Sequence, residues 1–326
     1  MNIPMRQPWT PDAERNYILR LIAGAPAAAR CALSSFACWL EQDCGRALGT
    51  IVRHVYSARR FVAQLCARRR MSAAKALRVV TAVDVEDFFV DYAKNNGPGA
   101  RRNMHAALRS FLKFAKSRSW VDEGVATALP SVRRYQLAGL PRAMPEADFK
   151  RLLITLRTDL VSPRDRAIIW LLACYGVRRG QVSALLLEDI NWRARTILFR
   201  PYKRGKAVEF RLLPVISNAL VRYLRFERPL HSDEFVFVRK PAPHWRLSPE
   251  QVGDVVRRCM RRAGLEPRGP HSLRHAFACR QLRNGGSLKT IADLLGHRSL
   301  GSVAIYAKVD HPRLLEAAVE WPEVRS

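Results

Sequence analysis

Residues 271–306 read HSLRHAFACRQLRNGGSLKTIADLLGHRSLGSVAIY. Apolar side chains in this stretch recur at helical spacing, so we predict helices over residues 271–283, 287–295 and 299–308. His271 and Arg274 stand at positions i and i+3 of the first helix and therefore share one face near its N-terminus. Free N–H groups and the positive end of the helix dipole at that terminus favour a bound phosphate.

Further polar residues can complete this set. His297 directly follows Gly296, a residue type that often ends a helix, so a sharp turn fixes the direction of its ring. Tyr306 lies nine residues after His297, inside the third predicted helix. Arg178 stands much earlier, at a junction between two predicted helices. If these residues converge, they can hold a phosphodiester and attack it.

The middle of the chain predicts a small sheet. Strand character is found in Thr196–Phe199, Phe210–Val215 and Phe235–Val238. A basic turn around Arg204 joins the first two strands, and Lys203 immediately precedes that turn. Ser162 has the position of an N-cap, with Pro163 at the first helical position. The second half is therefore α+β and mainly helical, with predicted helices over residues 146–156, 163–175 and 248–263.

The first half predicts a small, basic helical domain. Its helices are expected over residues 16–22, 51–69, 82–92 and 100–119. Pro130, Pro141 and Pro145 stand among polar and basic residues and indicate a linker. We therefore expect an N-terminal domain over residues 1–125, in which 1–50 are an extension, a linker over 126–145 and a second domain over 146–322.

The composition favours a polyanionic partner. The net charge is +28, from 56 lysines and arginines against 28 acidic residues. Such an excess favours nucleic acid, through phosphate neutralisation and counterion release. The seven cysteines form no Cys-x-x-Cys pair and suit free thiols in a reducing cytoplasm. Residues 21–40 are apolar but interrupted by Pro26 and Arg30, so we expect no membrane segment and a cytoplasmic, nucleoid-associated protein.

These elements together resemble a known family. Residues 164–190, with the core YGVRRGQV at 175–182, and residues 271–309 resemble the two signature boxes of the tyrosine recombinases, the phage-integrase family. The His-x-x-Arg, Leu-Gly-His and Tyr elements stand in the family's order, and the resemblance covers about residues 80–320. It implies the tyrosine-recombinase fold, in which an N-terminal helical (SAM-like) core-binding domain precedes a mostly helical catalytic domain with a small antiparallel sheet.

The resemblance also implies roles for the matching residues. Tyr306 is the expected nucleophile, which forms a covalent 3′-phosphotyrosyl link to DNA. Arg178 and Arg274 are expected to clamp the non-bridging phosphate oxygens, a task that suits planar, permanently charged guanidinium groups. The tyrosyl link retains the energy of the phosphodiester, so the family's reaction implies no metal, nucleotide or other cofactor.

The remaining roles concern protons. His271 and His297 are expected to donate hydrogen bonds and to help manage the proton of the tyrosine. Lys203 is expected to protonate the leaving 5′-oxygen, and Lys206, after the turn, is the alternative because hairpin loop length sets the register. The family often has an acidic residue three positions after the first arginine, where this chain has Gln181. We expect this departure to alter packing more than chemistry.

Other interpretations stay open. His271, His275 and Cys279 stand at i, i+4 and i+8 and suggest a zinc site, although no fourth ligand lies at a motif spacing. The chain could also be a DNA-binding architectural or regulatory protein that has lost strand transfer. A third possibility is an enzyme similar to type IB topoisomerases, which share the chemistry without the assembly on paired sites.

The leading interpretation is a metal-independent, site-specific DNA recombinase or integrase. We expect it to act on double-stranded DNA as a homotetramer on paired sites, or together with related recombinases. The apolar tail either packs on a neighbouring protomer or on its own domain; its residues are Leu314, Leu315, Ala318, Val319 and Trp321. The target DNA sequence is not specified, and a phage integrase, a chromosome-dimer resolvase and a mobile-element recombinase all fit. The Arg/Ala-rich N-terminal segment favours a mobile element and its integration, excision or transposition.

Overall fold

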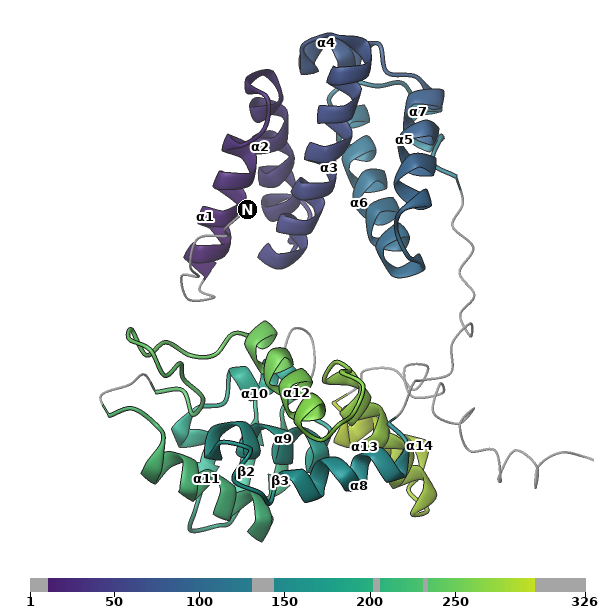
Figure 1. Cartoon of the computed structure of the whole chain (residues 1–326). Coiled ribbons are helices and arrows are strands. Elements are labelled where there is room, and N and C mark those ends of the chain that lie inside the picture. The colour runs from purple at the N-terminus through teal and green to yellow at the C-terminus, as the bar shows by residue number, and fades with distance from the viewer. Residues whose placement is uncertain (1–10, 131–143, 202–205, 231–233, 297–326) are drawn as a thin grey trace, which may run out of the picture. The chain divides into compact units, whose positions relative to one another are not determined.

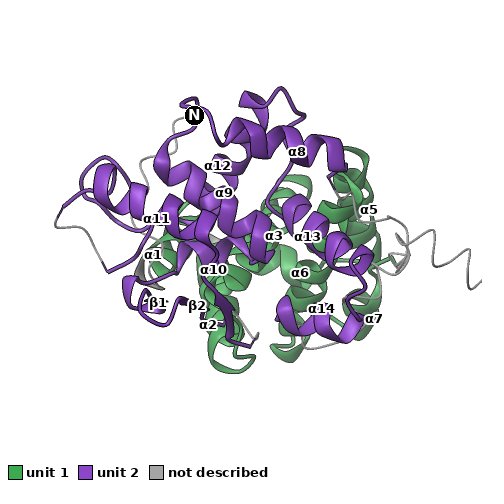
Figure 2. Ribbon diagram, turned by 90° about the horizontal axis from the view of Figure 1, so that it is seen from below, with its two compact units in different colours: residues 1–135 green, residues 136–326 purple. Residues whose placement is uncertain are grey.

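The structure is a computed structural model that describes residues 11–130, 144–201, 206–230 and 234–296. The chain divides into two compact units, residues 1–135 and 136–326, which Figure 2 colours green and purple. In the described residues the chain is mainly helical with a small antiparallel sheet. This confirms the predicted fold class.

The first unit is built around the long helix α3. In Figure 1, α3 lies between α2 and α6, and both helices pack against it. The side chains of Phe36 and Phe111 are fully buried and meet edge to face, with ring centroids 5.2 Å apart. The described helices of this unit are α1 (Pro11–Ala23), α2 (Ala27–Gln42), α3 (Leu48–Arg69), α4 (Ala73–Arg78), α5 (Ala82–Lys94), α6 (Pro98–Ser117) and α7 (Glu123–Thr127).

The second unit is built around the buried helix α9. Helices α11, α12 and α13 all pack against α9, and α13 and α14 lie side by side (Figure 1). The helices are α8 (Glu146–Thr155), α9 (Pro163–Tyr175), α10 (Arg179–Ser183), the 3-10 helix η1 (Leu187–Asp189), α11 (Pro214–Phe226), α12 (Pro249–Arg262), α13 (His271–Arg283) and α14 (Leu288–Leu294). The strands β1 (Ile190–Asn191), β2 (Thr196–Phe199) and β3 (Val208–Arg211) pair antiparallel in that order.

Local capping explains where α9 begins. The hydroxyl oxygen of Ser162 accepts a hydrogen bond from the backbone N–H of Asp165 at 3.3 Å, as predicted for an N-cap. The carboxylate of Asp165 is almost completely buried. It accepts a hydrogen bond of 2.6 Å from Arg258 on α12. The start of α9 is therefore also a joint to α12.

Most predicted helices are confirmed, and the largest errors concern strands. The helices predicted in the first half are found in α1, α3, α5 and α6, and those in the second half in α8, α9, α12, α13 and α14. The helix predicted over residues 299–308 lies outside the described residues. Neither α2 nor α11 was predicted from the sequence.

The predicted strand Phe210–Val215 is wrong at both ends. β3 spans Val208–Arg211, and Pro214 is the first residue of α11. Proline has no N–H to donate to a ladder, whereas its fixed φ suits the first turn of a helix. The predicted strand Phe235–Val238 forms only isolated bridges, between Leu186 and Phe235 and between Val238 and Arg246.

The predictions about cysteines and membrane segments can be compared with the described residues. All seven cysteines belong to the described residues, and each is a free thiol. Among the same described residues, no helix is both long and apolar enough to cross a membrane.

Gly176 ends α9 and directs the chain toward Arg178. Its φ is +61°, a left-handed conformation that glycine adopts without steric cost. A Cβ atom at this position would lie 2.5 Å from Cδ1 of Phe277 on α13 and 3.1 Å from Cδ2 of Leu295 after α14. The ends of α9 and α14 therefore meet α13 at a point that leaves no room for a side chain.

Gly176→Ala is expected to destabilise the second unit by about 3 kcal/mol, from left-handed strain together with overpacking against Phe277. Denaturant unfolding of the full chain measures the loss. Gly269→Ala is the matched control, because a Cβ there meets no atom within 4 Å. Equal stability of the two variants would contradict the close packing at Gly176.

Candidate active site

The predicted site residues divide into described and undescribed ones. Those within the described part of the structure are Arg178, His271 and Arg274, together with the alternative lysine Lys206. Those outside it are Lys203, His297 and Tyr306. The described residues come from three separate segments, and the contacts below bring these segments together.

Arg274 is the buried centre of the site. Only 4% of its surface is exposed. Its Nη1 donates to the carbonyl oxygen of Gly176 and its Nη2 to that of Leu295, both at 2.7 Å. A buried guanidinium stays charged, so it needs such hydrogen bonds to offset its lost hydration. The charge of Arg274 is thereby held in one place and one orientation.

Arg178 reaches the same carbonyl group. Its Nη1 donates to the oxygen of Leu295 at 3.4 Å. A carbonyl oxygen has two lone pairs and can accept both arginines. Two positive charges from segments almost a hundred residues apart therefore converge beside the end of α14. Such a pair is suited to a phosphate or another oxyanion.

Gly296 brings the β2–β3 hairpin to the same point. Its φ is +59°, as expected for a residue that ends a helix. A Cβ atom on Gly296 would lie 3.4 Å from the carbonyl oxygen of Lys206, 3.5 Å from Cγ2 of Val208 and 4.0 Å from Nη1 of Arg178. The residue before His297 thus lies beside the hairpin and Arg178, and a Cβ atom there would be at ordinary van der Waals distance from them.

Tyr175 is the tyrosine nearest to Arg178 in the sequence, and its hydroxyl group is fully engaged. It donates to the carbonyl oxygen of Arg211 at 2.7 Å and accepts from the N–H of Leu213 at 3.2 Å. Burial raises the pKa of Tyr175 to about 12. Tyr175 therefore ties the end of β3 to the end of α9 and is unsuited to nucleophilic attack.

The positive charges also act on His271. Its pKa is lowered by burial and then by the guanidinium groups of Arg274, Arg179 and Arg178. His271 is consequently neutral at pH 7, a state in which one ring nitrogen can accept a proton. The pKa of His275 on the same helix is also lowered, by burial, then by His271 and by Arg274.

Arg179 also contributes positive charge near His271, and this role was not predicted from the sequence. It forms an ion pair with Glu250 at the start of α12, with Nη2 and Oε1 3.1 Å apart. Its side chain passes close to Gly253, where Nη1 lies 3.5 Å from the position of a Cβ atom. The two adjacent arginines, Arg178 and Arg179, were the signal in the sequence that two cations lie between α9 and α10.

A metal site and a surface crevice were considered as alternative functional sites. Within the described ranges, no cluster of three or more His, Cys, Asp or Glu side chains could hold a metal ion.

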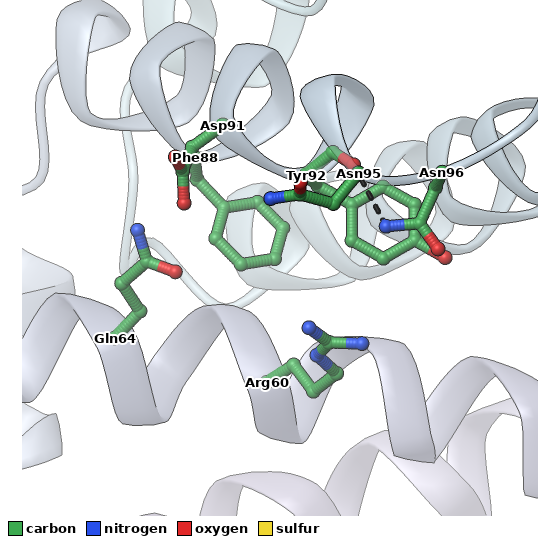
Figure 3. Close-up of a pocket in the computed structure, with 7 residues that line it drawn as sticks. All are labelled: Arg60, Gln64, Phe88, Asp91, Tyr92, Asn95 and Asn96. Atoms are coloured by element: carbon green, nitrogen blue, oxygen red, sulfur yellow. Dashed lines mark hydrogen bonds between the residues drawn. The ribbon is translucent and has the colours of Figure 1, made fainter.

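A crevice of about 80 Å³ lies between α3 and α5 in the first unit (Figure 3). There, Arg60 stacks over the ring of Tyr92 at 5.2 Å and the amide of Asn96 donates to the carbonyl of Tyr92 at 2.8 Å. These contacts hold the end of α5 against α3.

Replacing Arg179 by glutamine is expected to raise the pKa of His271 toward its ordinary value, because one of the cations that disfavour the imidazolium is removed. An NMR titration of the histidine side chains measures this shift in the protein without DNA. Arg257→Gln is the matched control: its guanidinium also lies beside Gly253, but it is not among the groups that shift His271. An unchanged His271 titration in Arg179→Gln would contradict the electrostatic account.

Comparison with known proteins identifies the family. The profile of the Phage integrase family matches residues 142–313. The chain is 36% identical over 251 residues to the integrase/recombinase-like protein y4rA of Sinorhizobium fredii, which covers 76% of this chain and 61% of that protein. It is 32% identical over 237 residues to the tyrosine recombinase XerC of Mesorhizobium japonicum, which covers 70% of this chain and 74% of the relative.

A solved structure supports the same fold. The XerH site-specific recombinase bound to a palindromic difH substrate superimposes with a TM-score of 0.67 at 19% identity, over 96% of this chain and 90% of that one. The chain spans only about three fifths of the length of y4rA. The profile match over residues 142–313 includes both arginines, both histidines and Tyr306, and on these grounds the chain belongs to the phage integrase family of tyrosine recombinases.

Proposed function

We propose that this protein cuts and rejoins DNA strands at specific sites through a covalent 3′-phosphotyrosyl intermediate. The observation that carries the proposal is the convergence of Arg178 and Arg274 on the carbonyl of Leu295, two residues before His297. The N-terminus of α13 with His271 belongs to the same cluster of charges. Membership of the phage integrase family supports this chemistry.

In the proposed cleavage step, the phenolic oxygen of Tyr306 attacks the scissile phosphorus. The bond from phosphorus to the 5′-oxygen breaks as the bond to Tyr306 forms. Negative charge grows on the non-bridging oxygens, and Arg178 and Arg274 stabilise it because their donors are already in place. The reverse attack by a 5′-hydroxyl group releases the tyrosine and restores a phosphodiester.

Two protons must move in this step. The tyrosine loses its proton, and a ring nitrogen of His271 or of His297 is proposed to accept it. The departing 5′-oxygen gains a proton, which we assign to a lysine of the β2–β3 hairpin. Lys203 remains the first choice and Lys206 the alternative. The contact between the carbonyl of Lys206 and Gly296 supports a lysine from this hairpin at the site.

The proposed partner is double-stranded DNA. The net charge of +28 supports this because cationic side chains neutralise phosphates. The similar XerH structure is itself a complex with a DNA substrate. We propose that the first unit is the core-binding domain, and that residues 146–322 form the catalytic domain.

The proposal extends to the assembly and the biological role of the protein. We propose a tetramer on paired sites, because strand exchange needs two cleaved duplexes. The solved lambda integrase neighbour is a dimer on a core site, and the Tn1549 transposon integrase is a neighbour from a mobile element. The transposon integrase supports the integration, excision or transposition of a mobile element as the role. We propose that the DNA acted on belongs to the nucleoid.

Tyr306→Phe is expected to abolish the covalent adduct, because phenylalanine has no oxygen with which to attack. The assay uses a nicked suicide substrate carrying the cognate site, and a denaturing gel shows the protein–DNA adduct. Tyr56→Phe, which alters an exposed tyrosine of α3, is the control and should form adduct as the wild type does. An adduct that persists in Tyr306→Phe would refute the assignment of the nucleophile.

Sulfur substitution at the 5′ bridging position is expected to identify the lysine. A thiolate leaves without being protonated, so loss of the general acid matters little for that substrate. On the oxygen substrate, the correct lysine-to-alanine variant should cleave about 100-fold or more slowly, and on the sulfur substrate nearly as fast as the wild type.

Single-turnover cleavage by Lys203→Ala and Lys206→Ala measures both rates. Rescue of only one variant assigns the role to that lysine. If both variants cleave the oxygen substrate at the wild-type rate, the hairpin does not supply the acid.

A further inference from the structure

Gln181 departs from the acidic residue that often occupies its position in this family. It is 6% exposed and lies in α10, three residues after Arg178. Its side-chain oxygen accepts a hydrogen bond from the backbone N–H of Arg178 at 3.0 Å. Its side-chain nitrogen donates to the carbonyl oxygen of Arg200 at 3.4 Å.

These two contacts fix the orientation of the amide. The backbone N–H of Arg178 can only donate, so the oxygen of Gln181 must face it. The carbonyl of Arg200 can only accept, so the nitrogen must face that side. A carboxylate could satisfy the first contact, but its second oxygen would oppose the carbonyl of Arg200. An amide is therefore the side chain that satisfies both partners.

The second contact reaches the end of β2. The β2–β3 hairpin, which includes Lys203 and Lys206 in its sequence, is called the lysine hairpin below. Arg200 directly follows β2, and Lys203 and Lys206 follow it in the sequence before β3. The guanidinium of Arg200 is itself held, since Nε donates to the buried carboxylate of Asp189 at 2.8 Å. Gln181 thus links the backbone of Arg178, before α10, to the backbone of Arg200, after β2. The side chain of Arg200 is in turn bound to Asp189.

We propose that Gln181 is a positioning residue, whose amide holds the lysine hairpin in register with Arg178 and does so through a donor that glutamate lacks. This inference rests on the proposed function, because it assigns the hairpin's purpose to delivery of the general acid. The first hydrogen bond caps α10, and the second couples the cap to the hairpin.

The variants follow from the two bonds. Gln181→Glu keeps the acceptor for the N–H of Arg178 and loses the donor to the carbonyl of Arg200. Gln181→Met keeps the shape of the side chain and loses both bonds. Gln251→Glu is the matched control for stability, because the oxygen of Gln251 likewise caps α12 by accepting from the N–H of Ser248 at 2.8 Å.

Single-turnover cleavage is compared on substrates with oxygen or sulfur at the 5′ bridging position. With oxygen near pH 8, Gln181→Glu should cleave about tenfold or more slowly than the wild type, since the general acid is displaced. With sulfur, the two rates should agree within about twofold, because the thiolate needs no proton. As the pH falls and the new carboxyl group takes up a proton, its O–H can donate to Arg200, so the deficit on the oxygen substrate should shrink.

Two outcomes of the cleavage assay overturn the proposal. Wild-type cleavage rates of Gln181→Glu on the oxygen substrate at every pH would show that the donor is not used. An equal deficit on both substrates would place the effect on Arg178 instead of the hairpin. A melting temperature of Gln181→Glu that matches that of Gln251→Glu excludes general unfolding as the cause.

Hydrogen exchange separates this proposal from the proposed function. In the protein without DNA, Gln181→Glu and Gln181→Met should exchange backbone amides faster around Arg200 and β3 than the wild type does. Unchanged exchange there would refute the positioning role whatever the cleavage activity. If the wild type forms no adduct but the exchange result holds, the proposed reaction fails while the coupling of Gln181 to the hairpin stands.

Discussion

The carbonyl oxygen of Leu295 is the acceptor on which the geometry of this site depends. It receives Arg274 at 2.7 Å and Arg178 at 3.4 Å, so two cations meet at one dipole. Unit charges about 4 Å apart repel each other by roughly 1–4 kcal/mol in water or near a protein surface. The hydrogen bonds to the shared carbonyl offset part of that repulsion. A bound phosphate would attract both arginines and so offset the rest. The arginines are thus oriented for an oxyanion before one arrives.

Close backbone packing makes this convergence possible. Gly176 and Gly296 both adopt a positive φ, and at Gly176 a neighbouring side chain also lies too close for a Cβ atom. Gly176 lets the ends of α9 and α14 meet α13, and Gly296 lies beside the β2–β3 hairpin at the end of α14. Gln181 adds a polar link between the Arg178 turn and the hairpin. Arg178 and Arg274 are therefore held where several elements meet, which favours precise positioning.

The sequence predicts the helix that carries His271 and Arg274 better than it predicts the sheet. His271 and Arg274 could be placed on one helix face because helical spacing and Pro270 determine local geometry. The convergence of Arg178 on Leu295 could not be derived from spacing, because it depends on tertiary packing, and only the family resemblance indicated it. Alternation of apolar residues extended the strand to Val215, whereas Pro214 begins α11. The ion pair of Arg179 with Glu250 joins residues far apart in the chain, so no local pattern revealed it.

In the proposed reaction, Tyr306 becomes covalently linked to DNA at this pair of arginines. The most direct test is mass spectrometry of the wild-type adduct after digestion with trypsin and nuclease. Tyr306 is the single tyrosine in the tryptic peptide Ser299–Lys308, so the site of attachment can be read without ambiguity. The account predicts a nucleotide joined through its 3′-phosphate to Tyr306 in this peptide. A nucleotide on any other residue, or a 5′-phosphate linkage, would contradict it.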